Sequence, residues 1–170
     1  VSERIAILHK LITLMRASFE ELVILAIKEG GKPLLDSRVE VTRAIEGVEL
    51  CIDGLKTQTS GQTPMAINQA SEGKLSFSVL EPIGIVVAVS AFNHPLNLIV
   101  HQIAPAIASG CPVIVKPATT TPMSCFTFVN MVIESGLPLG WCQCLLTENT
   151  KVTEALITDA RVDFFSFIGS

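Results

Sequence analysis

The stretch EPIGIVVAVSAFNHPLNLIVHQIAPAIASGCPVIVK, residues 81–116, decides the fold. It holds a short apolar segment, a turn that carries Asn93, a segment of helical length, and a second apolar segment that ends in Lys116. This order predicts a βαβ unit of the kind that binds nucleotides. Ligands of open α/β sheets bind at the carboxyl ends of the strands, so Asn93 and Lys116 both mark a predicted ligand site.

The same alternation continues to the end of the chain. The apolar segments are rich in Val, Ile and Phe with little polar interruption, which is typical of strands buried on both faces. We therefore predict an α/β fold in which N-terminal helices precede a Rossmann-like parallel sheet with helices on both faces. The expected strands are 84–90, 112–116, 143–146 and 162–167, and the expected helices between them are 95–108, 122–134 and 152–157.

The part before this sheet is predicted to be helical. Apolar residues recur at steps of three and four over residues 2–29, which predicts one helix that ends at the Gly30-Gly31 pair. A second helix is predicted over residues 36–55, with Asp36 or Ser37 as its N-cap.

A polar connector is predicted to follow these helices at 57–73. The apolar alternation of residues 74–81 predicts a strand with one covered face, in a small hairpin rather than in the main sheet. We predict a division into a helical region with its connector, residues 1–73, and a partial dinucleotide-binding domain, residues 74–170.

The composition indicates a protein with more apolar surface than this chain alone needs. Hydrophobic residues make up 49% and charged residues 16%, and the mean hydropathy is +0.53. No stretch reaches the roughly 20 apolar residues that a membrane-spanning helix requires. We expect no membrane partner, and we expect the excess to pack against a missing domain or another subunit.

Charge and cysteine content exclude other functions. The net charge of −4, the absence of tyrosine and the lack of a basic patch argue against nucleic-acid binding. The five cysteines have no metal-ligand spacing, and we expect no metal site. Cys142 and Cys144 would share one face of a strand and are too close for an ordinary disulfide. Reduced thiols and a cytoplasmic location are the expectation.

An ordered set of motifs now points to a family. The chain carries EGGKP at 29–33, a Pro-x-Gly-x-Val segment from Pro82, FNHP at 92–95, PAIASGCPVIVKP at 105–117, a Thr-Pro helix start at Thr121, ESGLP at 134–138 and FIGS at 167–170. In this order and spacing they resemble the aldehyde dehydrogenase superfamily over nearly the whole chain. EGGKP, FNHPLNL and Thr119 are most similar to its branch of lactaldehyde, phosphonoacetaldehyde and non-phosphorylating glyceraldehyde-3-phosphate dehydrogenases.

The resemblance gives Asn93 a catalytic role. FNHP matches the family's Trp/Phe-Asn-x-Pro, which implies that Asn93 stabilises the oxyanion when a cysteine thiolate attacks an aldehyde. A fixed amide donor contributes roughly 3 kcal/mol in such a place. The local sequence also allows Asn93 to be the N-cap of the helix that follows Pro95, and the two roles are compatible.

The resemblance also implies a set of cofactor contacts for NAD or NADP. Lys116 matches the lysine that is expected to bind the adenosine ribose hydroxyls. Thr119 stands where many relatives carry a glutamate, and a neutral hydroxyl does not repel a 2′-phosphate, so NADP stays open beside NAD. The other implied cofactor-binding positions are Ser90, Ala91, Phe92, Asn93, Pro117, Ala118, Gly169 and Ser170.

Two segments depart from the family pattern. Ile168 replaces the usual threonine of Phe-Thr-Gly-Ser, where the Ser170 amide is expected to face the pyrophosphate at a helix start. Residues 147–153 lack the two spaced glycines of most relatives, which removes the basis for assigning cofactor contacts there.

The family's nucleophilic cysteine and general-base glutamate follow the Phe-Thr-Gly-Ser motif. The chain is therefore predicted to be an internal part of an NAD(P)-dependent aldehyde dehydrogenase that is inactive by itself, from a parent that forms homo-oligomers. Cys111 and the histidines are predicted to be structural. The alternative is a truncated, non-catalytic module for nucleotide binding or subunit interaction.

Overall fold

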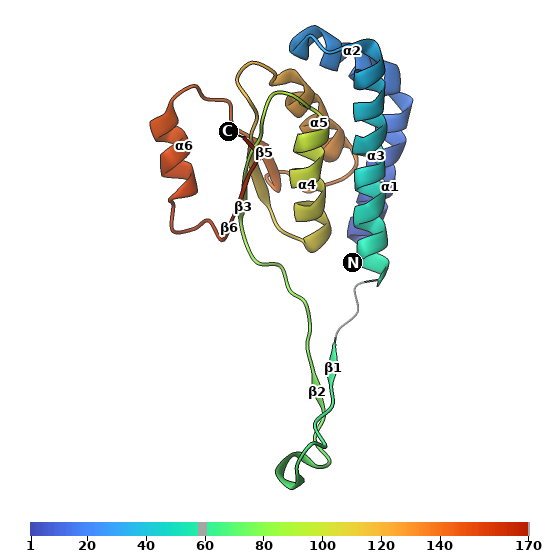
Figure 1. Ribbon diagram of the computed structural model, residues 1–170, viewed down its shortest axis with the longest axis vertical. Helices are drawn as coiled ribbons and strands as arrows, with labels where there is room; N and C mark the ends of the chain where they lie inside the picture. Colours follow the sequence, from blue (N-terminus) through green and yellow to red (C-terminus); the bar gives the residue numbers. More distant parts are fainter. Residues whose placement is uncertain (58–60, 170) are drawn as a thin grey trace.

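The computed structural model describes residues 1–57 and 61–169 (Figure 1). Three helices come first: α1 (Ser2–Ala17), α2 (Phe19–Gly30) and α3 (Leu34–Thr57). An arm follows with the short strands β1 (Gln62–Thr63) and β2 (Ser76–Phe77) and the 3₁₀ helix η1 (Gln69–Ser71). The remaining order is β3 (Val86–Val89), α4 (Asn97–Ser109), β4 (Val113–Lys116), α5 (Met123–Glu134), β5 (Cys142–Cys144), α6 (Thr150–Ile157) and β6 (Phe164–Phe167).

The predicted parallel sheet is confirmed. Four strands pair in the order β5-β4-β3-β6, and every pairing is parallel. The chain steps outward from β3 to β4 and β5, then returns through α6 to place β6 on the other side of β3. The strand order therefore reverses between β3 and β6, which is the place where open sheets of this kind bind ligands.

Helices cover both faces of the sheet, as the sequence predicts. Helices α4 and α5 lie on one face and α6 lies on the other (Figure 1). The N-terminal helices form a further layer outside α4 and α5, so that α3 and α1 pack against the Rossmann-like part. One continuous apolar core runs from this outer layer to the sheet, with Leu8, Val48, Ile103 and Val115 among its fully buried members.

Polar bonds connect the outer layer to both ends of α4. Arg4 of α1 donates to the carbonyl oxygen of Ala108 at the helix C-terminus. Glu40 of α3 accepts the backbone N–H groups of Leu96 and Asn97 at the N-terminus. A cation and an anion thus lie where the dipole of α4 favours each of them.

The single helix predicted over residues 2–29 is wrong in one respect, because the helix is broken at Ser18. Ser18 has φ −100° and ψ 20° and separates α1 from α2. Its N–H still reaches the carbonyl of Leu14, and its own carbonyl accepts from Leu22. The apolar spacing passes through the break without interruption, so the pattern gave no sign of it. The predicted end at Gly31 is confirmed, where φ is +64°.

The second predicted helix is confirmed with a different start. Helix α3 begins at Leu34, directly after Pro33, and Ser37 donates its backbone N–H to the Pro33 carbonyl. Neither Asp36 nor Ser37 is the N-cap, because both lie inside the first helical turns. Proline just before the first helical turn fits its fixed φ angle.

The predicted small hairpin is confirmed, but its predicted covered face is not. β1 and β2 pair antiparallel, with Gln62 opposite Phe77, and the arm extends away from the body (Figure 1). Leu75, Phe77 and Val79 alternate as predicted, yet they are 72%, 66% and 64% exposed. Among the described residues, nothing covers the apolar side of the arm. Residues 58–60 of the predicted connector lie outside the described residues.

No helix in residues 1–57 and 61–169 combines the length and the apolar character needed to cross a bilayer.

Candidate active site

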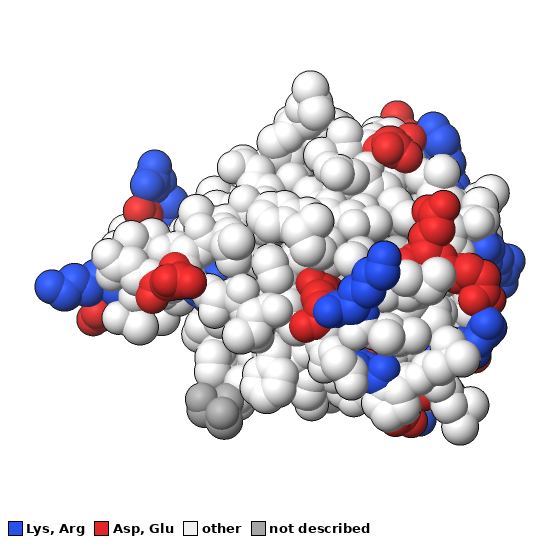
Figure 2. All heavy atoms as spheres, turned by 90° about the horizontal axis from the view of Figure 1, so that it is seen from above, with Lys and Arg blue, Asp and Glu red and all other residues white. Residues whose placement is uncertain are grey.

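The carboxyl ends of three strands meet at one edge of the sheet. Val89, the last residue of β3, is opposite Lys116 of β4 on one side and opposite Phe167 of β6 on the other. The segments that follow these strands carry the residues that the sequence singled out. Figure 2 looks down on this edge and shows charged side chains gathered toward its sides, with a largely uncharged surface between them.

Asn93 lies in the turn between β3 and α4 and is exposed, as is Phe92. The turn is tied to the neighbouring strand by the Ser90 N–H, which donates to the Lys116 carbonyl at 3.0 Å. Half-buried Ala91 follows Ser90. The buried Ser90 hydroxyl has no hydrogen-bond partner within the described residues.

The suggestion that Asn93 caps the following helix is wrong. Helix α4 begins at Asn97 with Leu96 as its N-cap, and the Leu96 side chain makes no capping hydrogen bond. The free amide groups at this end bind Glu40 instead: its Oε1 accepts from Leu96 at 2.9 Å and from Asn97 at 3.1 Å. The Asn93 amide is therefore not used as a helix cap and is exposed at the sheet edge.

The same bonds decide where an anion can bind. In many dinucleotide-binding sheets the pyrophosphate lies at the N-terminus of the helix after the first strand. Here a buried carboxylate already fills that position on α4. A cofactor pyrophosphate must use another part of the edge, and the sequence predicts the segment after β6 for this contact.

A pocket of about 540 Å³ lies beside Lys116 between the sheet and α6. Lys116 is half-buried, and its Nζ donates to the Pro117 carbonyl at 3.3 Å. Thr119 is exposed and lines the same pocket. The structure thus brings together the two residues that the family resemblance implies for the ribose end of the cofactor, with Pro117 buried and Ala118 half-buried between them.

The sequence missed the other wall of this pocket. Besides Val89, the additional lining residues are Thr147, Glu148, Thr150, Thr153, Glu154 and Ile157. Thr147, Glu148, Thr150 and Thr153 belong to the segment that lacks the family's glycines, and the other two follow it in α6. Asn149 caps α6 there, because its side chain accepts the Lys151 N–H at 3.0 Å. The sequence did contain a signal for this wall, a polar segment between a buried strand and a helix. The resemblance assigned no contacts to it, because the segment lacks the glycines of the family pattern.

Gly169 follows β6, which pairs with β3 on the side opposite β4. The β6 strand continues beyond Phe167 with one more bond, in which Ile168 donates its N–H to the Val89 carbonyl at 2.9 Å. Gly169 follows and is exposed. A Cβ at this position would lie 2.9 Å from the tip of the exposed Phe167 ring, so that ring would have to shift to accommodate a larger residue. Ser170, the predicted pyrophosphate contact, lies outside the described residues.

The cysteines do not form a reactive centre near Asn93. Cys111 precedes β4 at the opposite edge of the sheet, and Cys51 lies in α3. Burial raises the pKa of Cys142 to about 12 and keeps it a neutral thiol. The Cys125 thiol lies 3.5 Å from the Cys144 sulfur, and its hydrogen bond lowers the pKa of Cys144.

All five cysteines are free thiols. Among residues 1–57 and 61–169, no group of three or more His, Cys, Asp or Glu side chains has the arrangement of a metal site.

The fold defines a class of protein, a Rossmann-like parallel sheet with helices on both faces and an outer layer of N-terminal helices. The family model described as "Aldehyde dehydrogenase family" matches residues 1–170. The chain belongs to the aldehyde dehydrogenase family, which confirms the resemblance seen in its motifs.

Individual relatives agree with this membership. A 3-sulfolactaldehyde dehydrogenase from Priestia aryabhattai is 33% identical over 99% of this chain and 35% of its own length. Aldehyde dehydrogenase 21 of Physcomitrella patens, solved with succinate, superimposes with a TM-score of 0.94 at 34% identity, over 99% of this chain and 35% of that one. The glyceraldehyde-3-phosphate dehydrogenase GapN of Methanocaldococcus jannaschii, solved with NADP, gives 0.92 at 31% identity, over 99% and 37%.

The chain thus spans about a third of the length of these relatives. Other solved neighbours are described as an NADP-dependent enzyme from E. coli and a NAD-dependent benzaldehyde dehydrogenase from Corynebacterium glutamicum.

Proposed function

We propose that this chain forms the cofactor and oxyanion side of an NAD(P)-dependent aldehyde dehydrogenase that oxidises an aldehyde to a carboxylic acid. The observation that supports it best is the position of Asn93. Its side chain is exposed at the sheet edge, beside the reversal of strand order, and α4 does not use it as a cap. The Lys116 pocket opens next to it, since Val89 at the end of β3 lines that pocket.

The proposed role of Asn93 is to donate an N–H to the aldehyde oxygen as that oxygen becomes negatively charged. Attack by a cysteine thiolate makes this charge, and a preorganised amide stabilises it without moving. The thiolate and the general base are proposed to come from residues outside this chain. The thiohemiacetal formed by this attack would lose hydride to the nicotinamide of the bound cofactor and become a thioester, and water would then hydrolyse the thioester to release the acid and the free thiol.

The proposed cofactor residues fall on either side of Asn93. Lys116 would bind the adenosine ribose hydroxyls from its half-buried position, and the segment after β6, with Gly169, would face the pyrophosphate. The bound nicotinamide supplies the hydride acceptor. The neutral Thr119 hydroxyl in the pocket leaves room for a 2′-phosphate, as in an NADP enzyme. The buried Ser90 hydroxyl lacks a hydrogen-bond partner in the described part of the chain, and we propose that it binds the same cofactor.

The proposed substrate is a small aldehyde that carries an oxygen-rich neighbouring group. Two of the similar proteins are named for 3-sulfolactaldehyde and glyceraldehyde 3-phosphate. Both aldehydes bear a hydroxyl group and an anionic group close to the carbonyl. We propose the same class for this chain, which agrees with the branch that its motifs resemble.

The exposed apolar surface supports assembly with more protein. Phe164, Phe165 and Phe167 on the edge strand β6 are 50%, 40% and 58% exposed, and the arm exposes Phe77. We propose that other parts of the parent protein cover β6 and that the arm joins a second subunit in a cytoplasmic homo-oligomer. Residues 1–73 and 74–170 remain our proposed division into a helical region and a cofactor domain.

The direct test is coenzyme reduction by the complete gene product that contains residues 1–170. The proposal predicts NADH or NADPH formation with an aldehyde of the class above, and none with the corresponding alcohol. If every aldehyde in such a panel fails while NAD(P) still binds, the chain is instead a non-catalytic nucleotide-binding module. Calorimetric titration of the 170-residue chain with each cofactor measures that binding.

A further inference from the structure

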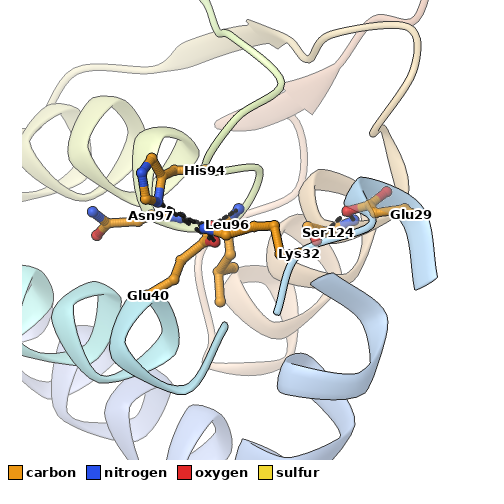
Figure 3. Close-up of polar contacts among 7 residues, drawn as sticks. All are labelled: Glu29, Lys32, Glu40, His94, Leu96, Asn97 and Ser124. Atoms are coloured by element: carbon orange, nitrogen blue, oxygen red, sulfur yellow. Dashed lines mark hydrogen bonds and ion pairs between the residues drawn. The ribbon is translucent and has the colours of Figure 1, made fainter. Parts of the chain in front are cut away.

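Two buried or half-buried carboxylates of the N-terminal helices bind the first amides of the two helices on one face of the sheet (Figure 3). Glu40 of α3 accepts from Leu96 and Asn97 at the start of α4. Glu29 of α2 accepts from Met123 at 2.7 Å and from the Ser124 N–H at 2.9 Å at the start of α5, and it also binds the Ser124 hydroxyl. The two contacts have the same chemistry at two different helices.

Glu40 is the more deeply buried of these contacts, with 1% of its surface exposed. One of its oxygens, Oε1, accepts both amides of α4. The other, Oε2, accepts from the Lys32 ammonium and lies 3.7 Å from Nδ1 of His94. Lys32 is itself 11% exposed, and its Nζ lies 2.8 Å from the same His94 nitrogen. The buried carboxylate is therefore both neutralised and fully hydrogen-bonded, which is the condition for a buried charge to be stable.

These contacts lie in the stretch of chain directly after Asn93. His94 is its immediate neighbour, and Leu96 is the residue at which α4 is capped. Glu40 and Lys32 thus hold the chain directly after Asn93 through two backbone amides and one imidazole. Lys32, between α2 and α3, and Glu40 of α3 lie more than fifty positions before the residues that they contact.

We propose that Glu40, together with Lys32, is a positioning residue for the Asn93 amide. The inference rests on the proposed function, in which Asn93 is the oxyanion donor. Such a donor is effective only if it is held in place before charge develops, so that no reorganisation is needed during the reaction. Within residues 1–57 and 61–169, the exposed Asn93 side chain makes no hydrogen bond that would hold it in place. The pair behind it supplies a rigid anchor that connects the helical layer to the reaction.

Glu29 provides the matched control. Glu29→Gln removes the same charge from the same kind of helix start, but α5 does not carry Asn93. Glu40→Gln and Glu29→Gln therefore weaken the contact between the helical layer and the sheet in similar ways. Only Glu40→Gln disturbs the turn with Asn93.

The first test uses nuclear magnetic resonance on the full 170-residue chain and does not depend on activity. In the unsubstituted protein the Leu96 and Asn97 amides should exchange slowly, although first-turn amides are normally open to solvent. Exchange at the unprotected rate would overturn the proposal. In Glu40→Gln the side-chain amide resonances of Asn93 should shift, and in Glu29→Gln they should stay. Unchanged Asn93 resonances in Glu40→Gln would show that Glu40 only caps a helix.

Lys32→Met keeps the proposal testable if Glu40→Gln does not fold. It leaves the Leu96 and Asn97 bonds in place and removes the contact with His94. The Asn93 and His94 resonances should shift while the Leu96 and Asn97 amides stay protected. Resonances of both side chains that match the unsubstituted protein would contradict the role of Lys32.

The second test uses the complete gene product. Glu40→Gln should lower kcat about ten- to a hundred-fold, the loss that small misplacements of catalytic groups cause, with the KM for the cofactor unchanged. Glu29→Gln should keep kcat. Equal kcat values in both variants would overturn the proposal. If the unsubstituted protein oxidises no aldehyde, the proposed function fails, and the resonance test still decides whether Glu40 positions Asn93.

Discussion

Lys116, the last residue of β4, stands directly opposite Val89, the last residue of β3. Because the two strands end at the same level, the turn after β3 and the Lys116 pocket open onto one edge of the sheet. Val89 lines the pocket, and the chain continues from it through Ser90 to Asn93. This register brings Lys116, a proposed cofactor residue, and the turn that carries Asn93, a proposed reaction residue, to the same edge of the sheet.

Replacing Lys116 should weaken cofactor binding. In Lys116→Met the proposed bond to the ribose hydroxyls is lost, and a hydrogen bond to a charged group contributes about 1.5–3 kcal/mol. The dissociation constant for NAD(P), measured by calorimetry, should rise about ten- to a hundred-fold. Lys10→Met on the exposed surface of α1 is the control and should bind normally. Equal NAD(P) affinities in both variants would show that Lys116 does not bind the cofactor.

Thr119 should control the choice between the two cofactors. Thr119→Glu adds a carboxylate to a pocket that already contains Glu148 and Glu154, and a carboxylate repels the 2′-phosphate. NADP binding should weaken about ten-fold relative to NAD. Thr120→Glu places the same charge on an exposed neighbour that does not line the pocket. A change of the same size in both variants would mean that Thr119 has no specific role.

The stability of the chain should fall at alkaline pH because of Cys142. Burial raises the pKa of this thiol from 9.0 to about 12, so the folded state holds its proton more tightly than the unfolded state. The stabilisation is complete below pH 9 and is lost as the pH rises toward 12. Urea unfolding across this range should show a steeper decline for the unsubstituted chain than for Cys142→Ala. Parallel curves would indicate that the folded thiol titrates normally.

Removal of Phe128 tests the core beneath the site. Phe128 of α5 is fully buried, and its replacement by alanine should lower the free energy of unfolding by about 3–5 kcal/mol. Phe167→Ala removes the same side chain from a position that is 58% exposed, and its effect should be much smaller. Chemical denaturation of both variants measures the difference. Losses of equal size would contradict the described packing around α5.

Most of the sheet could be predicted because its signals are local. Continuous apolar segments mark the strands of the sheet, although β6 is largely exposed in this chain. Lys116 ends one of these segments, and Asn93 lies in the turn after another. The break at Ser18 could not be predicted, since neither glycine nor proline marks it and the apolar spacing continues through it.

The parts of the site that depend on long-range contacts were also out of reach. Glu40 fills the N-terminus of α4 from a distant helix, so the sequence around Asn93 suggested a local cap that the structure does not use. Glu148 and Glu154 enter the pocket only because α6 packs beside the end of β4. Pattern and spacing describe neighbours along the chain, whereas these contacts arise from the fold.

The central claim is that Asn93 stabilises the oxyanion in an aldehyde dehydrogenase, and Asn93→Ala in the complete gene product tests it most directly. Steady-state kinetics with an aldehyde substrate should show kcat reduced about a hundred- to a thousand-fold, as expected when one oxyanion donor is lost. The affinity for NAD(P) should stay within about two-fold, because the ribose contacts remain. A variant that binds the cofactor and oxidises the aldehyde at the unsubstituted rate would contradict the account.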